Sequence, residues 1–112
     1  MKPFSVNQGE GSFVQMMEGV QRRNLVVGKE TMLCEFHLQQ GKVLPLHQHP
    51  AEQTGYLVSG RLLFEIDGEE VEMKVGDSWT IGGDVPHKVT VLETALVIET
   101  FTPVREDFLP QK

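Results

Sequence analysis

The chain has 112 residues, 39% of them hydrophobic, and a formal net charge of −6 at pH 7. This length encloses one core, so we expect a single domain over residues 1–112. The acidic balance argues against nucleic acid and anionic membranes as partners, since both require a basic face, and no apolar run approaches the ~20 residues of a membrane span. One cysteine, Cys34, excludes an internal disulfide. With no basic-then-apolar N-terminal pattern, this favours a cytoplasmic protein.

The first part of the chain predicts little regular structure and then a series of strands. Residues 1–18 show little periodicity, which predicts an irregular or edge segment, with a helix near 11–18 at most. From Gly19 onward, short β-branched and aromatic runs alternate with glycine turns, as in a sandwich or barrel. The first clear strand places four residues on one face: Met32, Cys34, Phe36 and Leu38.

The second half continues in the same way. Residues 62–66 alternate, Asp67-Gly68 predicts a two-residue hairpin turn because both residues tolerate positive φ, and residues 71–75 return on the partner strand. Trp79 and Ile81 are better explained as core than as ligand contacts. The last strand covers residues 95–101, and residues 103–112 form a C-terminal tail.

Histidines with ligand spacing form the main chemical signal. His47 and His49 are two residues apart, so on a strand their side chains point to the same face and can bind one ion. Gln53 follows four residues later, and His87 arrives eleven residues after Gly76. Glu52, one position from Gln53, should point away and is the weaker ligand candidate. His37 alternates with Glu35 on a mixed face and is expected at the surface.

These spacings resemble the two sequence motifs of the cupin superfamily. Residues 41–60 are similar to the first motif and residues 76–91 to the second, separated by a short spacer. The resemblance implies an all-β fold, the cupin double-stranded β-helix or jelly-roll barrel, with one divalent transition metal. The sequence departs from the motifs where Gln53 replaces an acidic ligand, at Gly82-Gly83-Asp84, and at Val91. We expect Gly60 to end the element that contains Gln53.

A narrower resemblance is to the cupins of pectin degradation, which convert unsaturated uronates to linear keto sugars. It rests on Glu18-Gly19 with Arg22-Arg23, on the run from His47 to Gln53, and on the run from Phe101 to Leu109. The resemblance implies metal ligation by His47, His49, Gln53 and His87. It further implies active-site roles for the residues at Glu99, Phe101 and Arg105, where Glu99 replaces the family's aspartate.

The implied site suits a small anionic sugar or keto-acid substrate. Three neutral imidazoles and one amide leave the metal's charge uncompensated, which favours anionic, oxygen-rich ligands. Ni, Mn, Fe, Zn, Co and Cu all suit these donors. In an isomerase mechanism, Arg105 would clamp the substrate carboxylate, Glu99 would shuttle a proton, and Phe101 would pack against the sugar ring.

Several alternatives remain open at this point. Strand alternation places Glu99 in an apolar row, so an internal salt bridge to Arg105 is the structural alternative to a catalytic role. A metal-dependent dioxygenase and a non-catalytic sugar- or metal-binding cupin are the alternative functions. One of Arg22 and Arg23 should face the cavity. We also expect a homodimer, in which the N-terminal segment through Val27 crosses to a partner sheet.

Overall fold

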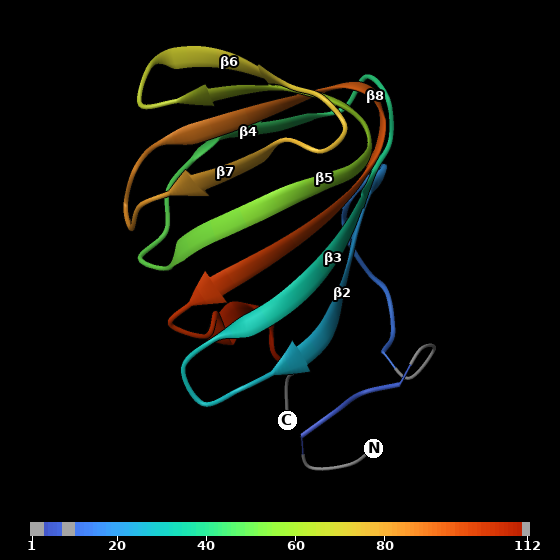
Figure 1. Cartoon of the computed structure of the whole chain (residues 1–112), viewed down its shortest axis with the longest axis vertical. Helices are drawn as coiled ribbons and strands as arrows, with labels where there is room; N and C mark the ends of the chain where they lie inside the picture. The colour runs from blue at the N-terminus through green and yellow to red at the C-terminus, as the bar shows by residue number, and fades with distance from the viewer. Residues whose placement is uncertain (1–3, 8–10, 111–112) are drawn as a thin grey trace.

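The computed structural model describes residues 4–7 and 11–110, and its regular structure is almost entirely β (Figure 1). The all-β prediction is confirmed, whereas the helix allowed near residues 11–18 is wrong because Val14–Met17 forms an edge strand that pairs with β2. The elements are β1 (Val14–Met17), β2 (Val20–Val27), β3 (Met32–Leu38), β4 (Val43–His47), β5 (Glu52–Ile66), β6 (Glu69–Met73), β7 (Ser78–Ile81), β8 (His87–Thr102) and the 3-10 turn η1 (Glu106–Phe108).

Two long bent strands, β5 and β8, connect the two layers of the fold. The start of β5 pairs with β7 and the end of β8, and the end of β5 pairs with β6 and the start of β8. β3 and β2 extend the first layer beyond β8, and β4 extends the second. The layers face each other as in a jelly roll, although the hydrogen-bonded path from β1 to β6 does not close.

Gly60 lies where β5 bends from one layer to the other. Its φ is +94°, and a Cβ there would stand 2.4 Å from the carbonyl oxygen of Thr94. The expectation that Gly60 ends the element is therefore wrong: the strand continues to Ile66, and glycine permits both the backbone conformation and the close approach of β8.

The core forms between the two layers from alternate strand residues. The predicted buried face of β3 is confirmed, and both Trp79 and Ile81 are buried as expected. Asp67 and Gly68 have φ of 50° and 83°, which confirms the hairpin turn between β5 and β6. Of the returning residues only Met73 is buried, because this hairpin extends beyond the core and leaves Val71 and Val75 in solvent.

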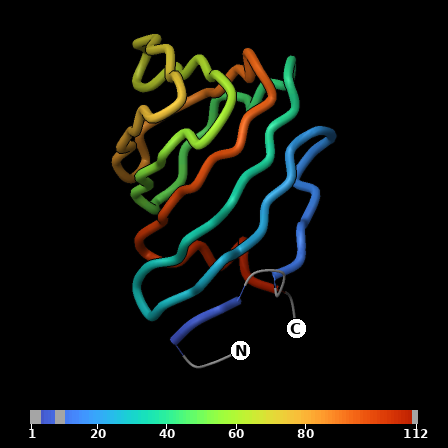
Figure 2. Tube along the Cα trace, turned by 45° about the vertical axis from the view of Figure 1, so that its right-hand side comes forward, coloured from blue at the N-terminus to red at the C-terminus, as the bar shows by residue number. Residues whose placement is uncertain are grey.

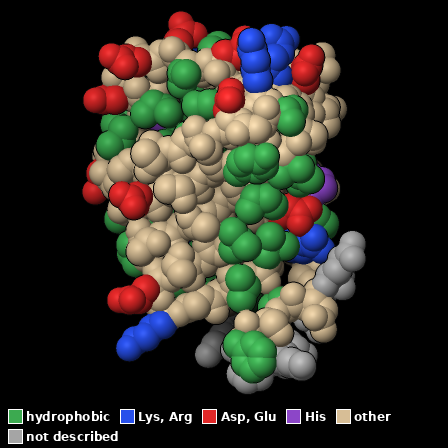
Figure 3. Space-filling model, in the orientation of Figure 1, with side chains coloured by type: hydrophobic (Ala, Val, Ile, Leu, Met, Phe, Trp, Pro, Cys, Tyr) green, Lys and Arg blue, Asp and Glu red, His purple; other side chains and the backbone are tan. Residues whose placement is uncertain are grey.

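The described segments nearest the two termini, residues 4–7 and 103–110, lie at the same end of the molecule (Figure 2). Residues 103–110 are not a loose tail: η1 turns back onto the sheet and Phe108 is buried against Phe101, with ring centroids 5.4 Å apart. Residues 1–3, 8–10 and 111–112, which belong to the predicted terminal segments, lie outside the described residues. Apolar side chains form a band down the middle of the face seen in Figure 3. Tyr56 and Val58 of β5 are among the exposed apolar residues. Within the described ranges, no helix has the length and hydropathy to cross a membrane.

Candidate metal centre

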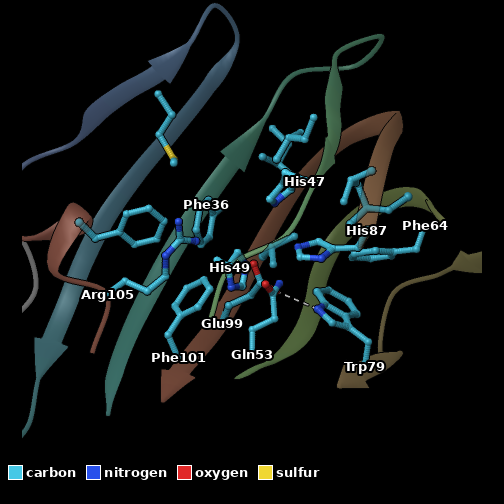
Figure 4. Close-up of a pocket in the computed structure, with 17 residues that line it drawn as sticks. Phe36, His47, His49, Gln53, Phe64, Trp79, His87, Glu99, Phe101 and Arg105 are labelled. Carbon is cyan, nitrogen blue, oxygen red and sulfur yellow. Dashed lines mark hydrogen bonds between the residues drawn. The ribbon is translucent and has the colours of Figure 1, made fainter. Parts of the chain in front are cut away.

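A small cavity of about 70 Å³ lies between the two layers, and the predicted site residues line it (Figure 4). Polar groups gather at its centre, surrounded by aromatic and aliphatic side chains. The predicted residues on its wall are His47, His49, Gln53, His87, Glu99, Phe101 and Arg105.

Three histidines converge in this cavity from separate parts of the chain. His47 ends β4, and it lies opposite His87, the first residue of β8, in the pairing of these strands. His49 lies two residues beyond β4, so the prediction that both motif histidines are on the strand holds only for His47. Three ring nitrogens, one from each histidine, lie within 4.8 Å of one another.

Backbone carbonyls fix which nitrogen of each ring faces the cavity. The Nδ1 atoms of His47, His49 and His87 lie 2.7, 2.9 and 2.8 Å from the carbonyl oxygens of Pro45, Ala51 and Val85. A carbonyl only accepts hydrogen bonds, so each Nδ1 carries a proton and donates it. In the neutral ring, Nε2 then has a free lone pair, which is the form that binds metal ions.

The donor atoms left in the cavity fit a metal ion. Across the described part of the chain, the Nε2 atoms of His49 and His87 are buried without a hydrogen-bond partner, a costly state that a metal ligand bond would relieve. Burial lowers the pKa of His87 to about 4 and also lowers the pKa of His49, so both rings are neutral near pH 7. The three histidines could therefore hold a transition metal ion.

Gln53 connects the histidine cluster to a buried carboxylate. Its side chain is buried at the start of β5, and its amide nitrogen donates to Oε2 of Glu99 at 2.5 Å. Because this contact orients the amide nitrogen toward Glu99, the amide oxygen is the atom available to a metal. Trp79 Nε1 donates to the same Glu99 oxygen at 2.9 Å.

Glu99 lies in the apolar row of β8, as the alternation predicts, but its partners differ from the expected alternative. The carboxylate is held by Gln53 and Trp79, whereas Arg105 pairs with Asp107, so the alternative of a Glu99–Arg105 salt bridge is not found. Burial raises the pKa of Glu99 to about 7, and the hydrogen bonds from Trp79 and Gln53 oppose this rise. A carboxyl group in this state can both accept and release a proton near neutral pH.

Arg105 lies at the mouth of the cavity beside two aromatic rings. Its guanidinium carbon is 3.9 Å from the centroid of Phe108 and 5.3 Å from that of Phe101. Phe101 is buried and packs edge-on toward His49, with centroids 6.0 Å apart. The last strand and the turn after it thus bring an aromatic wall and a cation to the histidine cluster.

The weaker candidates lie away from the cavity. Glu52 is exposed on the opposite face of β5, as expected, and exposed His37 contacts Glu35 on the outer surface. Burial raises the pKa of Cys34 to about 12, which agrees with its prediction as a core residue rather than a nucleophile.

Sequence reasoning missed three contacts around the site. Trp79 was expected only as core, although a buried indole N–H generally requires an acceptor. Arg22 is the buried member of the arginine pair, but neither arginine is among the residues that line the cavity, and Arg22 Nη2 instead donates to the Phe108 carbonyl oxygen at 3.0 Å. The pairing of Asp107 with Arg105 had no sequence signal beyond the short spacing of two opposite charges.

Comparisons with known proteins agree with this architecture. The model of the cupin domain family matches residues 34–101. The pectin degradation protein KdgF of Dickeya dadantii is 28% identical over 102 residues, covering 89% of this chain and 93% of that protein. The structure of KdgF from a Halomonas species has a TM-score of 0.86 and 30% identity over 97% of this chain and all of the other. An RmlC-like cupin from Shewanella frigidimarina has a TM-score of 0.88 and 27% identity, covering 97% of each chain.

Proposed function

The chain belongs to the cupin domain family, and from this we propose that it is a metal-dependent enzyme that converts a small unsaturated uronate to its linear keto form. Its similarity to the two KdgF proteins over nearly the whole chain supports a sugar acid as substrate. The observation that carries the reaction type is the position of Glu99, a buried carboxylate at the wall of the histidine-lined cavity.

We assign the metal to His47, His49, His87 and the amide oxygen of Gln53. Three imidazoles and one amide suit a first-row transition metal. When bound, the metal supplies a positive centre that polarises sugar oxygens without adding a proton. The chain contributes neutral ligands only, so the cavity favours anionic, oxygen-rich molecules.

Glu99 is the group that carries the proton in this proposal. Ring opening removes a proton from the anomeric hydroxyl and breaks the bond between C1 and the ring oxygen, which gives an aldehyde and an enol. Tautomerisation then moves the enol proton to C4 and gives a ketone, so no atom or electron is gained or lost overall. The Gln53 and Trp79 donors hold one Glu99 oxygen, and the second oxygen is left to exchange protons with the sugar.

Arg105 and Phe101 would orient the substrate. A guanidinium matches a carboxylate with two parallel hydrogen bonds, and Arg105 is held at the cavity mouth by the aromatic rings around it. Phe101 supplies a flat apolar surface beside His49 for the sugar ring. The two residues would fix the carboxylate end while the reacting end faces Glu99 and the histidines.

The test is incubation of metal-loaded protein with 4,5-unsaturated galacturonate, following the loss of enol absorbance. The proposal predicts that the absorbance falls steadily with the wild-type chain and at a rate at least about 100-fold lower with Glu99→Gln. Glu99→Asp, which keeps the carboxylate, should retain part of the activity. Chelator-treated protein is the control. Wild-type protein that holds metal but leaves the absorbance unchanged, or full activity in Glu99→Gln, would contradict the proposal.

A further inference from the structure

The guanidinium of Arg105 already binds a carboxylate within its own chain. Asp107 accepts from Nη2 at 2.8 Å and from Nε at 3.3 Å, which is the side-on arrangement that a substrate carboxylate would use. We propose that Asp107 is a specificity-determining residue: it occupies the carboxylate position at Arg105 and leaves only when the carboxylate of a sugar acid replaces it. This inference rests on the proposed function for the class of substrate.

Two spaces meet at Arg105, and this meeting indicates where the carboxylate lies. The internal cavity holds about 70 Å³, and a surface cleft of about 410 Å³ lies between residues 48–51 and 103–107. His49 and Arg105 line both spaces. Because Arg105 lines both spaces, a hexuronate that reaches from the histidines into the cleft lies beside its guanidinium.

Arg105 is held in place whereas Asp107 is not. The Arg105 side chain is 17% exposed and stacks on Phe108, while the Asp107 side chain is 63% exposed. The backbone of Phe108 is fastened to β2, because its carbonyl oxygen accepts from Arg22 at 3.0 Å and from Asn24 at 2.9 Å. An incoming anion therefore meets a fixed guanidinium and a displaceable aspartate.

Displacement of Asp107 makes binding selective at a small loss of affinity. Exposed ion pairs between flexible side chains are weak, so competition by Asp107 should reduce the affinity for a carboxylate only about two- to five-fold. A neutral sugar offers only hydroxyl oxygens to Arg105 and brings no negative charge to replace that of Asp107, so it gains little by displacing this residue. The residue thus favours ligands that carry a carboxylate at the cleft end.

The experiment compares Asp107→Asn with Glu106→Gln. Both variants remove one negative charge from η1, but within the described residues the Glu106 side chain has no hydrogen-bond or ion-pair partner. The probe is galacturonate, which lacks the 4,5 double bond and does not react. Its affinity for the full chain is measured by calorimetry at low ionic strength, and the NMR signal of the Arg105 Nε–H group reports binding at that residue.

The inference predicts that Asp107→Asn tightens galacturonate binding about two- to five-fold, with a shift of the Arg105 signal, and that Asp107→Ala tightens it at least as much. Glu106→Gln should change the affinity for galacturonate by less than half of the factor seen for Asp107→Asn. The affinity for neutral galactose should be unchanged in all three variants. Unchanged or weaker galacturonate binding in both Asp107 variants, or an equal gain in Glu106→Gln, would overturn it. Tighter binding without turnover of the unsaturated substrate would instead overturn the proposed function alone.

Discussion

Replacing Arg105 separates its role toward substrate from its role in folding. If Arg105 clamps the substrate carboxylate, Arg105→Ala removes charged hydrogen bonds from the transition state. Such bonds contribute about 2–4 kcal/mol when their partner is left unpaired. The corresponding loss in kcat/KM is roughly 30- to 1,000-fold.

The cost to stability should be much smaller, because the contacts that Arg105 makes are near the surface. The exposed pair with Asp107 contributes about 0.2–1 kcal/mol, and the stacking on Phe108 contributes about 0.5–1 kcal/mol. Glu99 keeps its Gln53 and Trp79 donors, so no buried charge is left without a partner. A loss of roughly 1–2 kcal/mol corresponds to a fall in Tm of about 5–15 °C.

The assay measures kcat/KM on 4,5-unsaturated galacturonate and thermal unfolding for Arg105→Ala and Arg105→Lys side by side. The lysine variant keeps the charge but not the two parallel donors, so its Tm should stay near that of the wild type while kcat/KM remains at least about ten-fold lower. If Arg105→Ala retains wild-type kcat/KM, or if the lysine variant restores both quantities fully, the clamp is refuted.

Three further predictions concern the metal environment, the bend and the assembly. Gln53→Glu should retain metal but lose activity, because it adds a negative charge beside Glu99 and weakens the attraction for anions; higher activity would show that the charge argument is wrong. Gly60→Ala should lower the free energy of unfolding by about 3 kcal/mol or more, because the added Cβ would overlap the carbonyl oxygen of Thr94. The control Gly41→Ala is also at positive φ but has nothing within 4 Å of the added Cβ, so it should lower the free energy of unfolding by only about 1–2 kcal/mol. Equal Tm values for the two variants would contradict this. Because β1 is an exposed edge strand, we expect a homodimer, and a monomer in light scattering at micromolar concentration would exclude it.

Local pattern predicted most of the strands, and the resemblance to the cupin motifs predicted the residues that share the cavity. Alternation correctly assigned the buried face of β3 and placed Glu99 inward, and the Asp67-Gly68 turn followed from backbone preference alone. Gly60 was misread because a glycine that ends a strand and a glycine that bends one have the same local sequence. Only the approach of β8 to β5, a contact between residues far apart in the chain, distinguishes them.

Partner choice was harder to predict than position. The sequence placed Glu99 and Arg105 near each other, but it could not show that Trp79 would satisfy the buried carboxylate from β7. It also could not choose between Arg22 and Arg23, because β-strand alternation defines two faces without saying which is inward. Pairings of this kind depend on tertiary distances, to which strand periodicity is not sensitive.

The metal assignment is tested most directly by elemental analysis of protein purified without chelator. Three neutral imidazoles and one amide should retain about one transition-metal ion per chain. The double variant His47→Ala, His49→Ala should lose the metal, whereas His37→Ala, which removes a histidine from the outer surface, should keep it. Stoichiometric metal in the double variant, or an absence of metal from the wild-type chain, would contradict the assignment.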